Sequence, residues 1–334
     1  MKRIVILLSL SCLLLTLCHC VQPENAKRFT FSGNTQGTYY QVTYYAADTV
    51  VTHVQIEEAL DKFLRVASLW DPESEISRVN GNEEMTVGTD FQAIFFEAQE
   101  ISRLTGGAFD ITVGGLVNAW GFGPYQPEDS VMVKIDSLRQ YVGFQNIDII
   151  NSVVVKKDPN IKIDFNAIAK GYSVDLMAQI LRHHNIDNFL VDIGGEVYAS
   201  GLKPDGGKWN VGIEKPSETD LSPQKVQEVI ALSNKATATS GTYRKYITKD
   251  DIRYSHTIDP TTGRPVEHSL LSVTVIADRC VTADALATAF MVMGVEKAME
   301  FLSENPQYEG YFIYCDEEND LQVVYTEGFK NLII

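Results

Sequence analysis

Cysteine is scarce in this chain and never clustered in its body. The sequence has 334 residues and five cysteines, of which Cys12, Cys18 and Cys20 lie within the first twenty positions. No CxxC pair or Cys/His cluster is present, which argues against a zinc site. The two remaining cysteines, Cys280 and Cys315, could pair in an exported protein or pack as buried thiols.

Common nucleotide-binding and hydrolase signatures are also missing. No GxGxxG follows a predicted strand, and no GxSxG is present. Residues 201–208 resemble a phosphate-binding loop, but the spacing is wrong and Trp209 replaces the usual Ser or Thr. Ser240 precedes a glycine, but nothing in the sequence marks it as a nucleophile, and we expect it to lie in a turn.

Positive charge is under-represented. Lys and Arg number 28 against 44 Asp and Glu, which gives a net charge of −16 and no basic cluster. This composition disfavours nucleic acid as a partner. Hydrophobic residues make up 45% and charged residues 22%, which is typical of a globular protein with a full core. No linker, repeat or low-complexity tract divides the chain, and we predict one catalytic domain at 29–334.

The N-terminus has the plan of an export signal, predicted at residues 1–20. Two basic residues precede an apolar run that is short for a transmembrane helix, and Cys18, His19 and Cys20 follow. This pattern suggests a bacterial lipoprotein with the lipid on Cys20. Because His19 stands where a small residue is usual, Cys18, simple secretion and an uncleaved anchor remain alternatives. Residues 21–28 are predicted to form a polar tether.

The predicted helices and strands show no strict βαβ alternation, which favours an α+β fold, or a mixed α/β fold, with mixed sheets and packed helices. Capping-box patterns at Thr52–Gln55 and Thr89–Gln92 each predict the start of a helix. Residues 106–123 contain six glycines, so we expect no regular element there. Strands are predicted within 29–45 and at 153–156, 161–165, 189–199, 209–213, 229–233, 237–239, 253–258, 271–277, 311–315 and 321–326.

The stretch VTADALATAFMVMG, at 281–294, predicts a buried helix with Thr282 as its N-cap. Asp284 and Thr288 are four residues apart and therefore share one face. A carboxylate rarely lies in an apolar helix without a partner, and a hard cation would bind both oxygens. The alternative is that Asp284 only caps the helix and Thr288 bonds to a carbonyl of the preceding turn.

Seven segments of the sequence, taken in order, resemble the blocks of the FAD:protein FMN transferase (ApbE) family: SLWDPESEISRVN, GGAFDITVGGLVNAWGFG, DFNAIAKGYSVD, VDIGGEVYASG, ATSGTYRKY, HTIDPTTGRP and TADALATAFMVMG. The resemblance covers roughly residues 30–330, and its last two blocks are the most specific. It implies an ApbE-like fold and an enzyme that binds FAD with a divalent cation, usually Mg²⁺. Many members are lipoproteins, which agrees with the predicted signal.

The resemblance also implies the reaction. A Thr or Ser hydroxyl of a target protein attacks the FMN-side phosphorus of FAD, AMP leaves, and FMN stays attached through a phosphoester. Typical targets are exported flavoprotein subunits of redox complexes, so the expected location is the bacterial cell envelope, anchored in the membrane and facing the periplasm. Two alternatives are an FAD pyrophosphatase, which forms FMN and AMP, and a non-catalytic flavin-binding lipoprotein.

Matching positions assign the expected site residue by residue. The resemblance implies metal ligands at the Ala167 carbonyl, Asp284 and Thr288, and candidate catalytic residues at His256 and Asp284. The implied FAD contacts are Gln36, Trp70, Ala108, Phe109, Asp110, Asp164, Lys170, His256 and Ile258. Two departures from the family pattern matter: Asn166-Ala167 replaces a usual Gly-Gly, and Ala287 replaces a second carboxylate found in some members.

Overall fold

A large antiparallel sheet organises the protein. The computed structural model describes residues 26–124, 131–216, 225–242, 246–249, 252–318 and 320–334. The sheet has eight strands, all joined to their neighbours in antiparallel pairs. Their order is β1 (Lys27–Thr35), β2 (Thr38–Ala46), β5 (Phe189–Ile193), β6 (Glu196–Ser200), β9 (Lys235–Gly241), β12 (Leu270–Ala277), β13 (Glu309–Cys315) and β14 (Leu321–Tyr325).

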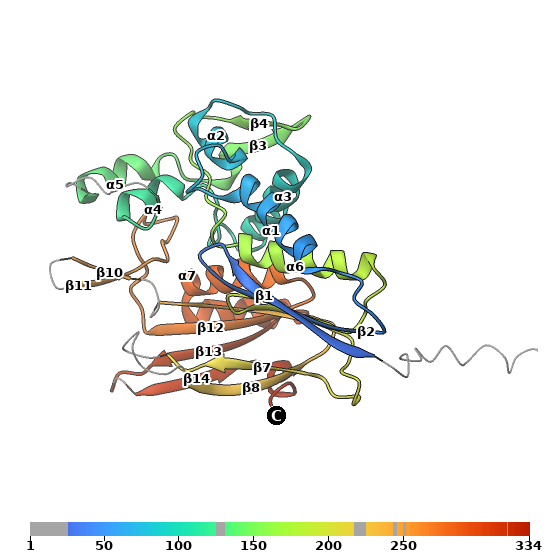
Figure 1. The fold of residues 1–334 in the computed structure, drawn as a ribbon. Helices are drawn as coiled ribbons and strands as arrows, with labels where there is room; N and C mark the ends of the chain where they lie inside the picture. Colours follow the sequence, from blue (N-terminus) through green and yellow to red (C-terminus); the bar gives the residue numbers. More distant parts are fainter. Residues whose placement is uncertain (1–25, 125–130, 217–224, 243–245, 250–251, 319) are drawn as a thin grey trace, which may run out of the picture.

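Helices cover one face of this sheet in two layers (Figure 1). The inner layer consists of α6 (Ala169–His183) and α7 (Cys280–Glu304), and the outer layer includes α1 (His53–Ala67) and α3 (Thr89–Leu104). The apolar sides of these helices pack on each other and on the sheet, and this forms the two largest clusters of buried side chains. Burial of these faces is the main stabilising term of the fold. It also fixes α6 and α7 side by side over the central strands.

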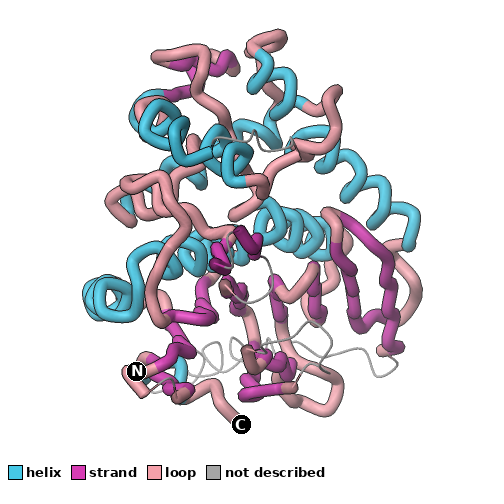
Figure 2. Tube along the Cα trace, turned by 90° about the vertical axis from the view of Figure 1, so that its left-hand side faces the viewer, coloured by secondary structure: helices cyan, strands magenta, loops and turns pink. Residues whose placement is uncertain are grey.

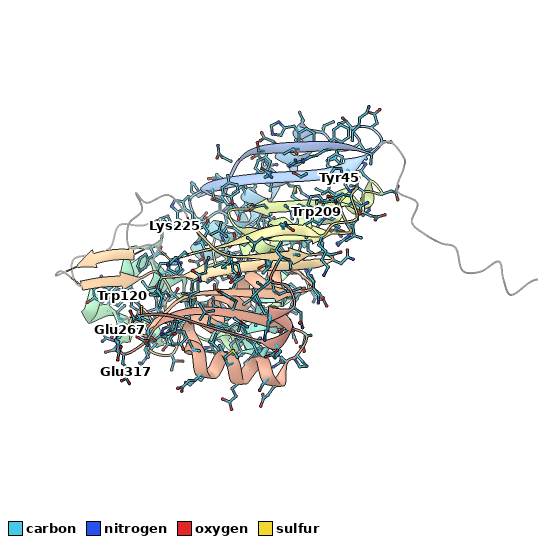
Figure 3. The ribbon with its side chains drawn as sticks, turned by 90° about the horizontal axis from the view of Figure 1, so that it is seen from below. Tyr45, Trp120, Trp209, Lys225, Glu267 and Glu317 are labelled. Carbon is cyan, nitrogen blue, oxygen red and sulfur yellow. The ribbon has the colours of Figure 1, made fainter. Side chains whose placement is uncertain are left out.

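The opposite face of the sheet is covered by a separate hairpin, β7 (Trp209–Glu214) and β8 (Val226–Leu232), together with the short helix α8 (Glu327–Lys330). Trp209 is buried there, and its ring centroid lies 5.7 Å from that of Tyr45 on β2. Figure 3 shows both rings on the underside of the molecule. Because both faces are covered, the central strands are buried on both sides.

The remaining elements lie at the periphery, and Figure 2 shows most of the helices above the strands of the large sheet. At the top of Figure 1 are α2 (Glu75–Gly81), β3 (Ile147–Ile150) and β4 (Val153–Lys156). At its left are α4 (Gly114–Trp120), α5 (Val131–Arg139), β10 (Tyr246–Lys249) and β11 (Ile252–Ser255). A single 3₁₀ turn, η1 (Phe144–Asn146), precedes β3. Trp120, labelled in Figure 3, joins α4 to a distant loop because its Nε1 donates to the Gly263 carbonyl at 2.9 Å.

The α+β prediction is confirmed, and so is the first capping box. Thr52 accepts from the backbone N–H of Gln55, whose side chain in turn accepts from the N–H of Thr52, and α1 follows. The second capping box was wrong: the N-cap of α3 is Gly88, and Thr89 is the first residue of the helix. The side chain of Gln92 instead donates to the Val87 and Gly88 carbonyls. Cys280 and Cys315 are free thiols.

Two further predictions were wrong in the region that crosses the core. Residues 161–165 form no strand; Lys162 makes only an isolated bridge to Val113. The reason is that the Asn80 side chain occupies the hydrogen-bonding groups of Ile163, donating to its carbonyl at 2.8 Å and accepting from its N–H at 2.7 Å. The glycine-rich stretch 106–123 contains a regular element after all, the two-turn helix α4.

The N-terminal predictions lie mostly outside the described residues. The signal at 1–20, with Cys18 and Cys20, is not described, and neither is most of the predicted tether. Strand β1 begins at Lys27, so the last two residues of that tether belong to the sheet. Among the residues that the structure describes, no helix has the length and apolar character needed to cross a membrane.

Candidate functional site at the start of two helices

The centre of the site is Asp284, which lies one turn into α7 and is only 4% exposed. Its Oδ2 accepts a hydrogen bond from the backbone N–H of Gly171, in the first turn of α6, at 2.9 Å. Asp284 therefore does not cap its own helix, and that part of the alternative was wrong. The helix begins at Cys280, with Arg279 rather than Thr282 at the N-cap. The Asp284 carboxylate lies where the free N–H groups of α6 favour negative charge.

A lysine and a second carboxylate join Asp284. Lys170, also in the first turn of α6, forms an ion pair with Oε1 of Glu196 at the start of β6. Glu196 is 2% exposed, whereas the side chain of Lys170 is 29% exposed to solvent. The predicted site residues Lys170 and Asp284 thus come together from two helices. Glu196, which sequence reasoning did not single out, completes the cluster.

The charges of this cluster depend on each other. Burial raises the pKa of Asp284 to about 7 and Glu196 adds to the rise, while Lys170 and the Gly171 N–H oppose it. Burial alone would lower the pKa of Lys170, but Glu196 and Asp284 raise it to about 12. The ammonium therefore stays charged at neutral pH. A partly exposed ammonium that stays charged beside a carboxylate can neutralise the charge of a bound phosphate.

Two hydroxyl groups lie next to this cluster, one of them on α7. Thr288 lies one turn after Asp284, and its Oγ1 is 3.3 Å from the Oγ of Ser240. Ser240 lies in β9, so the prediction of a turn there was wrong. Ala167, whose carbonyl was predicted as a ligand, lies in the turn that leads into α6. Ser240 was passed over because a lone Ser-Gly pair carries no signal until the strand places it beside α7.

This donor set fits a hard cation that shares its coordination with a phosphate. Asp284 supplies a carboxylate, Thr288 a hydroxyl and Ala167 a carbonyl in the turn before α6. Mg²⁺ is commonly held by one or two carboxylates and takes its other ligands from substrate phosphates and water. Within the described ranges, no three His, Cys, Asp or Glu side chains form a cluster that could hold a metal.

Asp175 on α6 accepts hydrogen bonds from backbone N–H groups at the start of α7, just as Asp284 on α7 accepts one at the start of α6. Its Oδ1 accepts from the Cys280 N–H at 2.9 Å and its Oδ2 from the Val281 N–H at 3.0 Å. Arg279, the N-cap of α7, makes no side-chain capping bond. Each helix thus receives a carboxylate from the other. This reciprocal capping sets the position of Asp284 relative to Lys170.

We expect Asp175→Ala to lower the free energy of unfolding by about 2 kcal/mol, because two N–H groups at a helix start lose their acceptor. Urea unfolding followed by circular dichroism measures this loss. The matched control is Asp278→Ala, which removes an exposed surface pair with Lys235 near the same helix end and should change stability by less than about 0.5 kcal/mol. Equal stability of the two variants would contradict the capping role of Asp175.

Gln36 lies beside α6, at the turn between β1 and β2. Its Nε2 donates to Oγ of Ser173 on α6 at 2.7 Å, and its backbone has φ 50°. A cavity of about 440 Å³ is lined by residues 34–39 of this turn. The predicted FAD contact at Gln36 is thus placed next to the helix that carries Lys170. Its contact with the cofactor stays a prediction.

The other predicted FAD contacts differ in how far their side chains are exposed and free to contact a ligand. Trp70 is 61% exposed between α1 and α2, so its ring is open to stacking. Ala108 is partly buried against the core, and Phe109 lies within it. Both oxygens of Asp110 already accept hydrogen bonds, Oδ1 from Thr112 and Oδ2 from the Phe144 N–H at 2.7 Å. In this structure Asp110 shapes the loop, and its carboxylate is not directed at an open space.

The last predicted residues flank two different regions. Asp164 is buried, and its Oδ1 accepts from the Asn166 N–H at 2.7 Å, which tightens the turn ahead of α6. His256 follows β11, with its ring 6.3 Å from that of Phe122. Ile258 is buried in the small core around α4 and α5. The structure therefore links Asp164 to the α6 side of the site, and sets His256 and Ile258 beside the peripheral helices.

Fold and site together define a single-domain α+β protein with a charged, oxygen-rich site at two helix starts, suited to a cation and a phosphate ester. The ApbE family model matches residues 36–312, and the chain belongs to the ApbE family. It is 40% identical over 301 residues to a FAD:protein FMN transferase of Vibrio cholerae, covering 87% of this chain and 89% of that protein. A second FAD:protein FMN transferase, from Haemophilus influenzae, is 36% identical and covers 99% of both chains.

Solved structures agree with this assignment. The flavin transferase ApbE from Vibrio cholerae superposes with a TM-score of 0.81 at 36% identity, over 92% of this chain and 99% of that one. The Pseudomonas stutzeri flavinyl transferase ApbE, in its apo form, gives the same TM-score at 32% identity, over 92% and 97% of the two chains. The resemblance drawn from the seven sequence blocks is therefore confirmed.

Proposed function

We propose that this protein is a Mg²⁺-dependent FAD:protein FMN transferase that attaches FMN to a Thr or Ser hydroxyl of a target protein and releases AMP. The observation that carries the proposal is the contact between the two helix starts, where Asp284 meets Gly171 beside Lys170. Phosphoryl transfer requires mainly positioning and charge neutralisation. This cluster offers both, in a chain whose relatives bear that activity in their names.

The reaction forms one bond and breaks one. The acceptor oxygen bonds to the FMN-side phosphorus, the pyrophosphate bond to the AMP moiety breaks, and the hydroxyl proton passes to a base or to solvent. Lys170 supplies a fixed positive charge for the pyrophosphate, and the free N–H groups at the start of α6 add to it. Trp70 offers an exposed ring for stacking on the cofactor.

The proposed cation ligands are Asp284, Thr288 and the Ala167 carbonyl, with FAD phosphate and water completing the shell. When bound, Mg²⁺ supplies charge neutralisation at the bridging and non-bridging oxygens. Ala287 stands where a second carboxylate would be needed, so we assign one cation to this site.

We also propose that the acceptor is an exported flavoprotein subunit of a redox complex and that the protein acts at the periplasmic side of a bacterial membrane, anchored by a lipid on Cys20 or Cys18. The support is the charged-then-apolar plan of residues 1–20, which ends in these cysteines.

His256 is proposed to assist the acceptor hydroxyl or the phosphate. We expect His256→Ala to slow FMN transfer by about a hundredfold, the lower end of the usual contribution of a general acid or base. The rate of acceptor modification at saturating FAD and Mg²⁺ measures it, with Phe122→Leu as the control for the loss of the neighbouring ring contact. Unchanged transfer in His256→Ala would remove this residue from the mechanism.

The decisive experiment incubates the purified full chain with FAD, Mg²⁺ and a protein domain that carries a Thr acceptor motif. The intact mass of the acceptor and free AMP are followed together. An acceptor heavier by FMN, with an equal amount of AMP, supports the transferase. Free FMN and AMP with an unmodified acceptor would identify an FAD pyrophosphatase. Stable FAD binding without either product would identify a non-catalytic flavin-binding protein.

A further inference from the structure

Glu196 is a buried carboxylate that the proposed reaction does not use. It begins β6 directly after the Gly194–Gly195 turn, and the residue two positions on, Tyr198, packs against α6. Side chains two apart on a strand share a face, so Glu196 points toward the same helix layer. There its Oε1 pairs with Lys170. Its Oε2 is buried and has no hydrogen-bond partner in the described part of the chain.

The cluster therefore has two carboxylates and one ammonium. Lys170 interacts electrostatically with both Glu196 and Asp284, but in the described ranges its ion pair is with Glu196. Asp284 uses Oδ2 to hold the Gly171 N–H. The lysine is thus held on the sheet side of the cluster. A lysine has a flexible four-carbon stem, so the position of its ammonium depends on which carboxylate holds it.

We propose that Glu196 is a positioning residue, which holds the Lys170 ammonium away from Asp284 and so keeps the Asp284 carboxylate open to the divalent cation. The inference rests on the proposed function, because it takes Asp284 as the cation ligand. Without Glu196, the carboxylates left to interact with Lys170 are Asp284 and Asp192. Asp192 already accepts hydrogen bonds on both oxygens, from the Gly195 N–H and the Tyr39 hydroxyl. The ammonium then competes with the cation for the Asp284 oxygens.

A double-mutant cycle on Glu196 and Lys170 tests this mechanism, with Mn²⁺ as the probe. The free Mn²⁺ signal in electron paramagnetic resonance gives the dissociation constant for the full chain without FAD, so the measurement does not depend on activity. The four proteins are the wild type, Glu196→Gln, Lys170→Met and the double variant. Glu196→Gln keeps the size of the side chain, and thermal unfolding confirms that each variant is folded.

We expect Glu196→Gln to weaken Mn²⁺ binding about fivefold to tenfold when Lys170 is present and to have no effect when Lys170 is replaced by Met, because residues in one ion-pair network are energetically coupled. Glu100→Gln is the matched control, since it removes one negative charge from an exposed pair with Arg103 on α3. It should leave the dissociation constant unchanged.

Three outcomes would overturn the inference. Equal weakening with and without Lys170 would show that Glu196 attracts the cation directly by its charge. No weakening in Glu196→Gln would show that Lys170 does not compete for Asp284. Undiminished Mn²⁺ binding in Asp284→Ala would place the cation elsewhere and refute the metal site of the proposed function as well. If the second outcome is accompanied by loss of binding in Asp284→Ala, the inference alone is refuted and the proposed metal site stands.

Discussion

Replacement of Asp284 by alanine should reduce FMN transfer by about a thousandfold or more, since a bound cation contributes several kcal/mol to the transition state and each 1.4 kcal/mol is a factor of ten. Asp284 is the carboxylate of the proposed cation site, and the other proposed protein ligands, the Thr288 hydroxyl and the Ala167 carbonyl, are neutral. The ion pair of Lys170 is with Glu196, so it does not depend on Asp284. The initial rate of AMP release at saturating FAD and Mg²⁺ measures the effect.

Two further variants separate chemistry from folding. Asp284→Asn keeps an acceptor for the Gly171 N–H but removes the charge, so it should lose activity and remain folded. Asp278→Asn changes an exposed aspartate just before the same helix and should transfer FMN at the wild-type rate. We expect Asp284→Ala to be somewhat less stable than the wild type, because the buried Gly171 N–H loses its acceptor, although removing a buried carboxylate also removes the cost of its burial. Transfer at the normal rate in Asp284→Ala would place the cation on other donors.

The parts of the fold that depend on neighbouring residues were predictable from the sequence. The capping box at Thr52 and the spacing of Asp284 and Thr288 are local, and both patterns correspond to real helical geometry. The single strand predicted at 189–199 was wrong, because the Gly194–Gly195 pair turns the chain into two antiparallel strands, β5 and β6. Each of these signals lies within a few residues of the structure that it specifies, so no knowledge of the tertiary fold is needed.

What could not be predicted depends on contacts between distant segments. The caps of α6 and α7 come from the opposite helix, through Asp284 and Asp175, so no capping pattern precedes either helix start. The extended segment around Ile163 reads as a strand, but a side chain 83 positions away occupies its hydrogen-bonding groups. Glu196 had one usable signal, a charged residue directly after a glycine pair in an otherwise buried strand.

The site is formed where α6 and α7 contact each other. Lys170 and Gly171 come from one helix and Asp284 and Thr288 from the other, and the two helices approach closely enough for backbone and carboxylate to meet. The resemblance to the family assigned most of these residues, because members of one family share the tertiary packing that brings such residues together. The physical reason for their arrangement is the reciprocal capping together with one glycine at the contact.

Gly171→Ala should lower both stability and activity, although glycine-to-alanine changes inside helices usually stabilise. A Cβ at this position would lie 2.5 Å from the Cys280 carbonyl oxygen and 2.7 Å from Cβ of Asp284. Both atoms belong to the fixed start of α7, so the helices must separate. Overpacking of this kind costs about 1–3 kcal/mol. We also expect transfer to slow, because the separation stretches the bond between the Gly171 N–H and Asp284.

Gly115 of α4 provides the matched control, since the nearest atom to its added Cβ would be Cδ2 of Leu138 at an ordinary 3.9 Å. Gly115→Ala should therefore raise the free energy of unfolding by about 0.5 kcal/mol and leave transfer unchanged. Chemical unfolding and AMP release, measured on both variants, distinguish the two glycines. If Gly171→Ala proves as stable as Gly115→Ala, the helices are not in the close contact that places Asp284. If it is unstable yet fully active at low temperature, the contact supports folding but not the geometry of the site.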